Sequence, residues 1–199
     1  MSLALMVMTA VLTTYTSLAR NFTRSLGISS ASQPTLESQA RRTLAYFAQD
    51  VRMASTIAAT TTPASPNATT VTLTLPTGTG TNQVTYYYNS NAITSSTNSD
   101  NVTVNGTSIE MQRQALTRCV YNGSTVTTLL LQSSVLSCTF NYYDSSGNPY
   151  TSYTNYLPGI KQLSVTFTTQ AGSSTNGTLT QIYQTDSPRL LVRNKTLLQ

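Results

Sequence analysis

The chain has 199 residues and a formal net charge of +5, and only 9% of its residues are charged. This fraction is far below the ~25% that is usual in soluble domains, which argues against a cytosolic enzyme and favours an exported or envelope protein. The chain contains no histidine, so the commonest general base and the commonest metal ligand are both missing.

The first element in chain order is an apolar run over residues 3–18, which contains no charge, glycine or proline. With Ala19 it gives about 17 uncharged residues, the lower limit for a helix that spans a bilayer. We interpret residues 1–26 as a hydrophobic helix. Gly27 and the serines that follow indicate a break before the next element, near residues 27–34.

The origin of this run stays open between three interpretations. Ser17-Leu18-Ala19 fits the small-x-small pattern at which signal peptides are cleaved, but no basic residue precedes it. The second interpretation is a membrane anchor, although Arg20 and Arg24 follow the run, which by the positive-inside rule favours the wrong orientation. The third is a chain that lacks its natural beginning, because a basic leader upstream would remove both conflicts.

A second helix is predicted over residues 35–58. Proline is tolerated in the first turn of a helix, and a proline stands at position 34. Apolar residues then recur at steps of three or four, which is one stripe of an amphipathic helix. We expect this stripe to pack on a sheet, through Leu36, Leu44, Phe47 and Val51.

Beyond the second helix the apolar period changes to two, which is typical of strands. Asn-Gly pairs at residues 105–106 and 122–123 are hairpin signals. Residues 70–199 are therefore predicted to form an antiparallel β domain. The predicted fold class is α+β, with a long N-terminal hydrophobic helix, broken near residues 27–34, packed on the antiparallel sheet.

Residues that could carry chemistry are few. The acidic residues lie far apart in the sequence, and without histidine no nucleophile–base pair is visible, so no catalytic, metal or cofactor site is predicted. Cys119 and Cys138 fit one disulfide in an oxidising compartment. A simple meander would hold them about two strand spacings apart, beyond the ~7 Å that a bridge allows, so this disulfide is left open.

Several segments follow one another in an order that is similar to one known family. They are the helix over residues 39–54 and the stretches at 114–118, 121–123, 135–147, 160–167 and 188–194. This succession resembles the type IV pilin-like family, in particular PilW-like minor pilins and J-type minor pseudopilins of type II secretion. The family's prepilin cleavage motif, a Gly followed by Phe-Thr-Leu-Ile-Glu, is not found in the sequence, and no acidic residue precedes Glu37.

The resemblance implies a non-enzymatic structural subunit that assembles through its N-terminal helix into a type IV pilus or a type II secretion pseudopilus, at its priming or tip complex. Its partners would be other pilin or pseudopilin subunits, with no small-molecule substrate or cofactor, and nucleic acid is not expected. The chain would be a single-pass protein of the bacterial inner membrane with a periplasmic domain, and later part of the pilus, the pseudopilus or the cell surface. The apolar contacts in the membrane and in the fibre core would come from Leu3, Leu5, Val7, Val11, Leu12 and Leu18.

A different class of protein fits the same composition. The chain would then be an exported surface adhesin or binding domain that uses its Tyr- and Thr-rich loops, with residues 1–19 as a signal peptide. A mature N-terminus at Arg20 would support this alternative.

Overall fold

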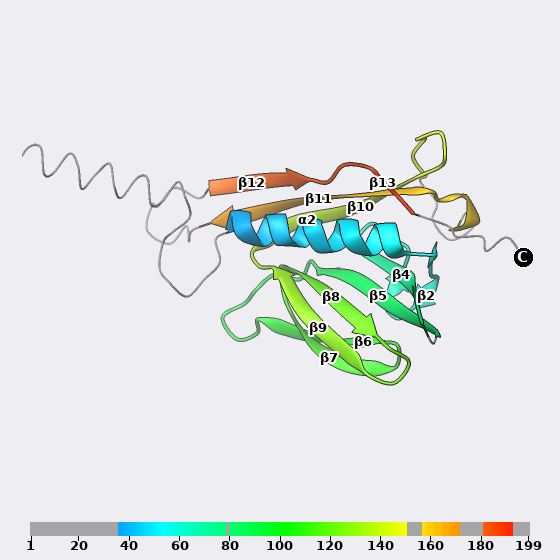
Figure 1. Ribbon diagram of the computed structural model, residues 1–199. Coiled ribbons are helices and arrows are strands. Elements are labelled where there is room, and N and C mark those ends of the chain that lie inside the picture. Colours follow the sequence, from blue (N-terminus) through cyan, green and yellow to red (C-terminus); the bar gives the residue numbers. More distant parts are fainter. Residues whose placement is uncertain (1–35, 79, 151–156, 172–180, 193–199) are drawn as a thin grey trace, which may run out of the picture. The chain divides into compact units, whose positions relative to one another are not determined.

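The computed structural model describes residues 36–78, 80–150, 157–171 and 181–192 (Figure 1). The chain divides into two compact units, residues 1–39 and 40–199, and only the start of one helix is described in the first unit. The described residues are mostly β-strand, with one α-helix, α2 (Leu36–Met53).

This architecture corrects the predicted fold class. The structure does not show a long hydrophobic helix packed on a sheet, because α2 is amphipathic and its outer face carries Arg41, Arg42 and Arg52. In the described part of the chain, no helix is long and apolar enough to cross a membrane. The predicted localisation as a single-pass inner-membrane protein is corrected on this finding. The predicted helix over residues 1–26, with its six apolar contact residues, lies outside the described residues.

Helix α2 has charges that suit its two ends. Glu37 lies in the first turn and Arg52 in the last, where each opposes the partial charge of the helix terminus. The helix ends at Met53 rather than near residue 58, because the chain turns into strand β1 (Thr56–Ile57). Thr56 stands opposite Thr74 of the neighbouring strand, and this pairing replaces the last predicted helical turn.

The larger sheet has five antiparallel strands in the order β1-β4-β5-β8-β9. Its members after β1 are β4 (Thr70–Thr77), β5 (Gly80–Asn89), β8 (Ala115–Tyr121) and β9 (Val126–Gln132). Each long neighbour pair is antiparallel, and successive residues of a strand alternate between the two faces of the sheet; the β8–β9 pair has a register shift between Leu116 and Thr117. Strand β9 is therefore the last strand on one side of this sheet.

The smaller sheet is built on β11, which pairs with three strands. The four strands are β10 (Val135–Tyr143), β11 (Gln162–Ala171), β12 (Gln181–Asp186) and β13 (Leu190–Leu191). The side of β10 away from β11 is closed, since the Phe140 amide donates to the Ala68 carbonyl at 2.8 Å. The Tyr142 hydroxyl also donates to the carbonyls of Asn67 and Thr70. These bonds join the smaller sheet to the start of β4.

Two small hairpins and a short helical turn complete the described chain. They are β2 (Thr60–Thr61) with β3 (Ala64–Ser65), β6 (Ser99–Val104) with β7 (Thr107–Gln112), and the 3₁₀ turn η1 (Leu157–Gly159). The turn between β6 and β7 is the Asn105-Gly106 pair, whose φ angles of 48° and 81° place both residues in the left-handed region. Asp100 anchors this hairpin to Arg113, whose Nη2 lies 2.6 Å from a carboxylate oxygen.

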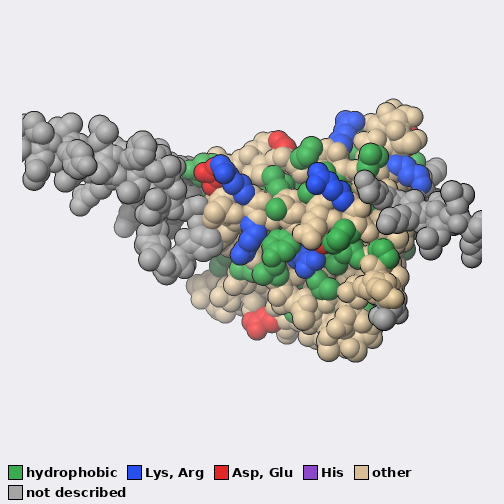
Figure 2. All heavy atoms as spheres, in the orientation of Figure 1, with side chains coloured by type: hydrophobic (Ala, Val, Ile, Leu, Met, Phe, Trp, Pro, Cys, Tyr) green, Lys and Arg blue, Asp and Glu red, His purple; other side chains and the backbone are tan. Residues whose placement is uncertain are grey.

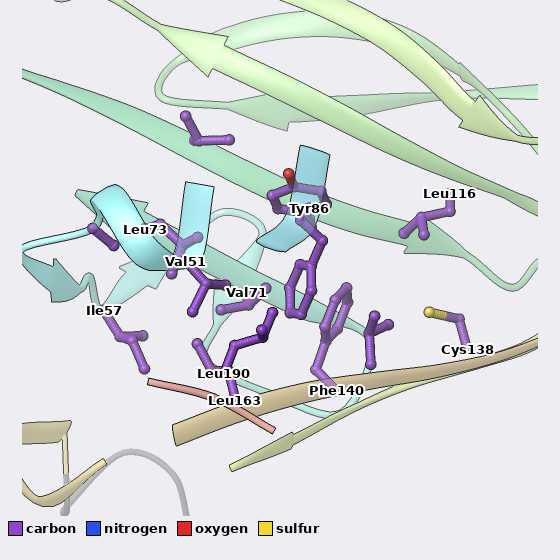
Figure 3. Packing of buried hydrophobic residues seen from close by; sticks show 14 of the residues in the cluster. Val51, Ile57, Val71, Leu73, Tyr86, Leu116, Cys138, Phe140, Leu163 and Leu190 are labelled. Atoms are coloured by element: carbon purple, nitrogen blue, oxygen red, sulfur yellow. The ribbon is translucent and has the colours of Figure 1, made fainter. Parts of the chain in front are cut away.

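The core lies where α2 meets both sheets. The Phe47 ring contacts Tyr86 of β5 edge-to-face at 5.3 Å and Phe140 of β10 at 5.9 Å between ring centroids. Figure 3 shows Tyr86 and Phe140 side by side, with Val51 and Leu163 packed close to them. Aromatic pairs in such geometry add to the gain from buried area, so this junction fixes the helix to both sheets at once.

The four residues predicted to pack the helix on a sheet have different environments. Phe47 and Val51 are buried in the core, and Leu44 is half-buried against it. Leu36 is half-buried at the first helical position and belongs to the first unit, residues 1–39.

The two cysteines are buried free thiols and do not form a disulfide. Cys138 of β10 lies in the main core, whereas Cys119 of β8 lies in a small cluster with Val104 and Met111 of the β6–β7 hairpin. The structure shows no bridge between them, because Cys119 packs against the β6–β7 hairpin and Cys138 packs in the main core.

Candidate interaction surface

A buried ion pair holds α2 on the larger sheet. Asp50 lies on the buried face of the helix with 1% of its surface exposed, and Arg118 reaches it from β8. Arg118 donates through Nε at 2.7 Å and through Nη2 at 3.0 Å, one bond to each carboxylate oxygen. Tyr86 of β5 donates its hydroxyl to Asp50 at 2.6 Å. This two-pronged arrangement satisfies the buried carboxylate and fixes its position.

The electrostatics of this group favour its bonded form. Burial raises the pKa of Tyr86 well above its ordinary value, and the neighbouring Asp50 carboxylate raises it further, so the phenol keeps its proton and donates it. Burial lowers the pKa of Arg118, but the hydrogen bonds to Asp50, the negative charge of Asp50 and a further contribution from Tyr86 together outweigh it and raise the pKa. The three side chains thus form a neutral unit at the helix–sheet contact.

The guanidinium of Arg118 also contacts the helix from a second direction. Its central carbon lies 5.4 Å from the centroid of the Tyr46 ring, within the range of a cation–π contact. Because Tyr46 and Asp50 are one helical turn apart, Arg118 holds two adjacent positions of α2. The rotation of α2 about its own axis is therefore fixed, and the same residues always face outward.

The outward face of α2 is basic. Arg41, Arg42 and Arg52 are exposed on it, and the only acidic residue of α2 within residues 40–53 is the buried Asp50. Figure 2 shows Lys and Arg side chains spread over the face on which α2 lies. Asp50 is neutralised by Arg118, so it does not offset the charges of Arg42 and Arg52 on this face, while Glu37 lies in the first turn of the helix.

Strand β9 lies beside this helix and is the outermost strand of the larger sheet. The register of the β8–β9 hairpin determines which backbone groups of β9 point away from β8. The Asn122 amide donates to the Thr125 carbonyl, and Val126 stands opposite Tyr121. Alternate residues of an antiparallel strand bond to the same neighbour, so the backbone groups of Val126, Thr128 and Leu130 point away from β8.

The contact of one arginine of α2 with Leu130 agrees with this outward direction of the backbone groups. Arg42 donates through Nη2 to the Leu130 carbonyl at 3.2 Å. The backbone groups of Val126 and Thr128 have no hydrogen-bond partner outside the β8–β9 ladder in the described part of the chain. We call this row, the outward edge of residues 126–130 with Arg42 beside it, the β9 edge.

The described residues include two buried free thiols. No cluster of three His, Cys, Asp or Glu that could hold a metal ion occurs among the described residues. Burial raises the pKa of the Cys119 thiol to about 12 and raises the pKa of Cys138 as well, which leaves both sulfurs protonated near neutral pH. What the surface can do chemically is to bond extended backbone at the β9 edge and attract carboxylates to α2.

Sequence reasoning did not find Asp50, Arg118 or Tyr86. A weak signal existed for Asp50, which stands between Phe47 and Val51 of the predicted apolar stripe, where an unpaired carboxylate would be costly. No sequence signal identifies Arg118 as its partner, because they are 68 positions apart.

Neither of two comparisons with known proteins found a match. No family model matches the chain, and no curated protein matches it. The similarity to minor pilins and pseudopilins therefore remains a prediction from the sequence.

Proposed function

We propose that the chain is a non-enzymatic structural subunit of a pilin-like or pseudopilin-like assembly, in which its β domain contacts neighbouring subunits. The observation that supports this most is the fixed attachment of α2. An ion pair, a phenol and a ring junction hold one helix on two sheets, while its opposite face stays exposed and basic. A rigid helix–sheet unit with an open face suits a protein whose work is contact between subunits.

The sequence adds a second support. The segments that resemble minor pilins include the amphipathic helix and the strands that contact it, among them β8 with Arg118 and β10 with Phe140. These are the elements that meet at the core junction. The proposal makes no use of residues 1–35, whose structure is not described.

The experiment is made in the cells that produce the protein. A photo-crosslinking amino acid replaces Gln49, which is exposed on the outer face of α2, and crosslinked products are identified by mass spectrometry. The matched control carries the same probe at Ser145, an exposed position in the loop after β10. The proposal predicts crosslinks from residue 49 to pilin-like or pseudopilin-like subunits, and loss of the assembled fibre when the gene is deleted.

Two results would contradict the proposal. One is a chain that stays monomeric in these cells, with no crosslink to a subunit of this class and with fibres unaffected by the deletion. The other is a chain on the cell surface whose mature N-terminus is Arg20 and which takes part in no assembly, since that result favours a separate adhesin.

A further inference from the structure

We infer that the β9 edge binds an extended, acidic strand segment of a partner subunit, which adds to the larger sheet as a sixth strand. The inference deepens the proposed assembly function and rests on it only for the class of partner. The binding mode itself follows from the backbone and the charges of the described residues.

The backbone of the β9 edge offers hydrogen-bonding groups to an added strand. The outward N–H and C=O groups of Val126 and Thr128, and the N–H of Leu130, form a regular row with the spacing of a sheet ladder. An added strand gains affinity from main-chain hydrogen bonds, which need no particular side chain. The β9 edge is thus able to pair with any partner that arrives in extended form.

The β9 edge lacks the features that usually prevent an exposed strand from pairing with another chain. Natural sheets usually block exposed edges with lysine, proline, a bulge or a covering element. Residues 126–130 are Val-Thr-Thr-Leu-Leu, without charge or proline, and Thr127, Thr128 and Leu130 are exposed. The register shift in β9 falls only beyond Leu130, after the open row. Neither charge, proline nor bulge therefore blocks the edge over this length.

The positive charges beside the β9 edge favour an acidic partner strand. Strands β8 and β9 and helix α2 carry four arginines, one aspartate and one glutamate. Arg118 and Asp50 neutralise each other, and Glu37 lies one helical turn before Arg41, which leaves Arg42 and Arg52 as the further positive charges of the exposed face. Arg42 already stands at the edge, bonded to the Leu130 carbonyl. A strand beside β9 therefore meets positive charge on its helix side, which favours carboxylates there.

The same charges disfavour a second copy as the occupant. Pairing of β9 with the β9 of another copy would bring two basic helix faces to one side of a shared sheet, and the chain as a whole carries a net charge of +5. Like charges across an interface cost binding free energy. The acidic strand of another subunit is the better complement.

The test measures peptide binding to the full chain by fluorescence anisotropy. The probe is a labelled peptide of sequence Thr-Glu-Val-Glu-Val-Glu-Thr, and the control peptide has Lys in place of each Glu. Saturable binding of the first peptide and no binding of the second at equal concentration is the expected result. Equal binding of both, or of neither, would overturn the inference.

Two pairs of variants locate the site. Thr128→Pro removes an outward N–H and is expected to weaken binding about tenfold, while Thr128→Val keeps that N–H and binds as the parent does. Arg42→Gln is expected to weaken binding about two- to fivefold, and Arg52→Gln, about 15 Å further along the helix, by less. Because Arg42→Gln leaves the strand intact, it keeps the inference testable if Thr128→Pro unfolds the chain.

Two further results separate this inference from the proposed function. A chain that dimerises in sedimentation experiments and loses the dimer in Thr128→Pro has another copy at the edge, which overturns the acidic partner. A Thr128→Pro chain that folds and joins the cellular assembly as well as the parent overturns the role of the β9 edge and leaves the assembly function standing.

Discussion

Asp50 and Arg118 are 68 positions apart in the sequence and are joined in the fold by two hydrogen bonds of 2.7 and 3.0 Å. One residue belongs to the only described α-helix and the other to a central strand, so the pair fixes how the helix lies on the sheet. The exposed basic face of α2 and its contact with β9 both follow from this fixed position.

The first prediction removes one partner of this pair. Asp50→Asn leaves the guanidinium of Arg118 largely buried without its counter-charge, and it weakens the hydrogen bond from Tyr86. Breaking a buried pair in this way costs about 3–5 kcal/mol of unfolding free energy. Urea denaturation monitored by circular dichroism measures this loss.

Two further variants test whether the loss at Asp50 comes from breaking the buried pair. Asp186→Asn changes the same chemical group at an exposed position and is expected to shift the free energy of unfolding by less than about 0.5 kcal/mol. Replacing both partners, as in Asp50→Leu with Arg118→Met, should be less harmful than Asp50→Asn alone. An Asp50→Asn chain as stable as the parent would show that the pair does not hold the helix.

The second prediction concerns the ring junction. Phe47 is 1% exposed and touches aromatic rings from both sheets, so Phe47→Ala leaves a cavity between them. A loss of about 3–5 kcal/mol in unfolding free energy is expected, measured by the same denaturation. Leu191→Ala, at a residue that is 63% exposed, serves as the control and should change stability little. An equal change in unfolding free energy for the two variants would show that Phe47 does not lie in the core.

Only part of the core around Phe47 and Asp50 can be predicted from the sequence. The helical stripe through Phe47 and Val51 is visible in the sequence, because the steps between apolar residues match the turn of a helix. Which strands the stripe meets is not visible, since that depends on strand order. The same limit applies to the Asp50–Arg118 pair and to β9 as an edge, which become apparent only when the order β1-β4-β5-β8-β9 is known.

The observed helix ends at Met53, before the predicted end near residue 58, for a related reason. Residues 54–58 could continue the helix by their local pattern, but Thr56 and Ile57 stand opposite Thr74 and Leu73 in an antiparallel strand pair instead. Tertiary pairing overrides a weak local preference of this kind. The expectation of a long hydrophobic helix depended on residues 1–26, which the structure does not describe.

The third prediction concerns the thiols. Because Cys119 and Cys138 are buried and burial raises the pKa of each, neither should react with a thiol reagent in the native chain at pH 8. Both should react in 6 M guanidinium, which is about the concentration that unfolds most domains. Counting the labelled thiols by mass spectrometry, without any reductant, checks this. Loss of both thiols in the unfolded, unreduced chain would reveal a disulfide and contradict the strand placement.

The fourth prediction uses the carboxylate that anchors the β6–β7 hairpin. Hydrogen bonds from Arg113, then from Asn91 and Asn89, hold the pKa of Asp100 well below its ordinary value of 3.8. A lowered pKa in the folded state contributes stability above the ordinary pKa, and that contribution is lost as the pH falls toward the folded value. The melting temperature of the parent should therefore exceed that of Asp100→Asn at pH 7, and the gap should narrow below about pH 4.

A second variant tests the cause of the Asp100 effect. Arg113→Gln removes the first of the groups that lower the Asp100 pKa, so Asp100→Asn in that background should show a smaller gap at pH 7. Thermal melts followed by circular dichroism between pH 7 and pH 2 give both comparisons. A gap that is independent of pH would mean that the charge of Asp100 does not stabilise the hairpin.

If the chain is a structural subunit of an assembled fibre, as we propose, it must be present in isolated fibres, and this is the most direct measurement. Fibres are sheared from the producing cells, purified, and labelled with gold-conjugated antibody against the β domain, with cells lacking the gene as the control. We expect gold on the fibres or at their ends, and no gold on material from the strain that lacks the gene. Purified fibres without the chain, together with unchanged fibre formation in its absence, would contradict it.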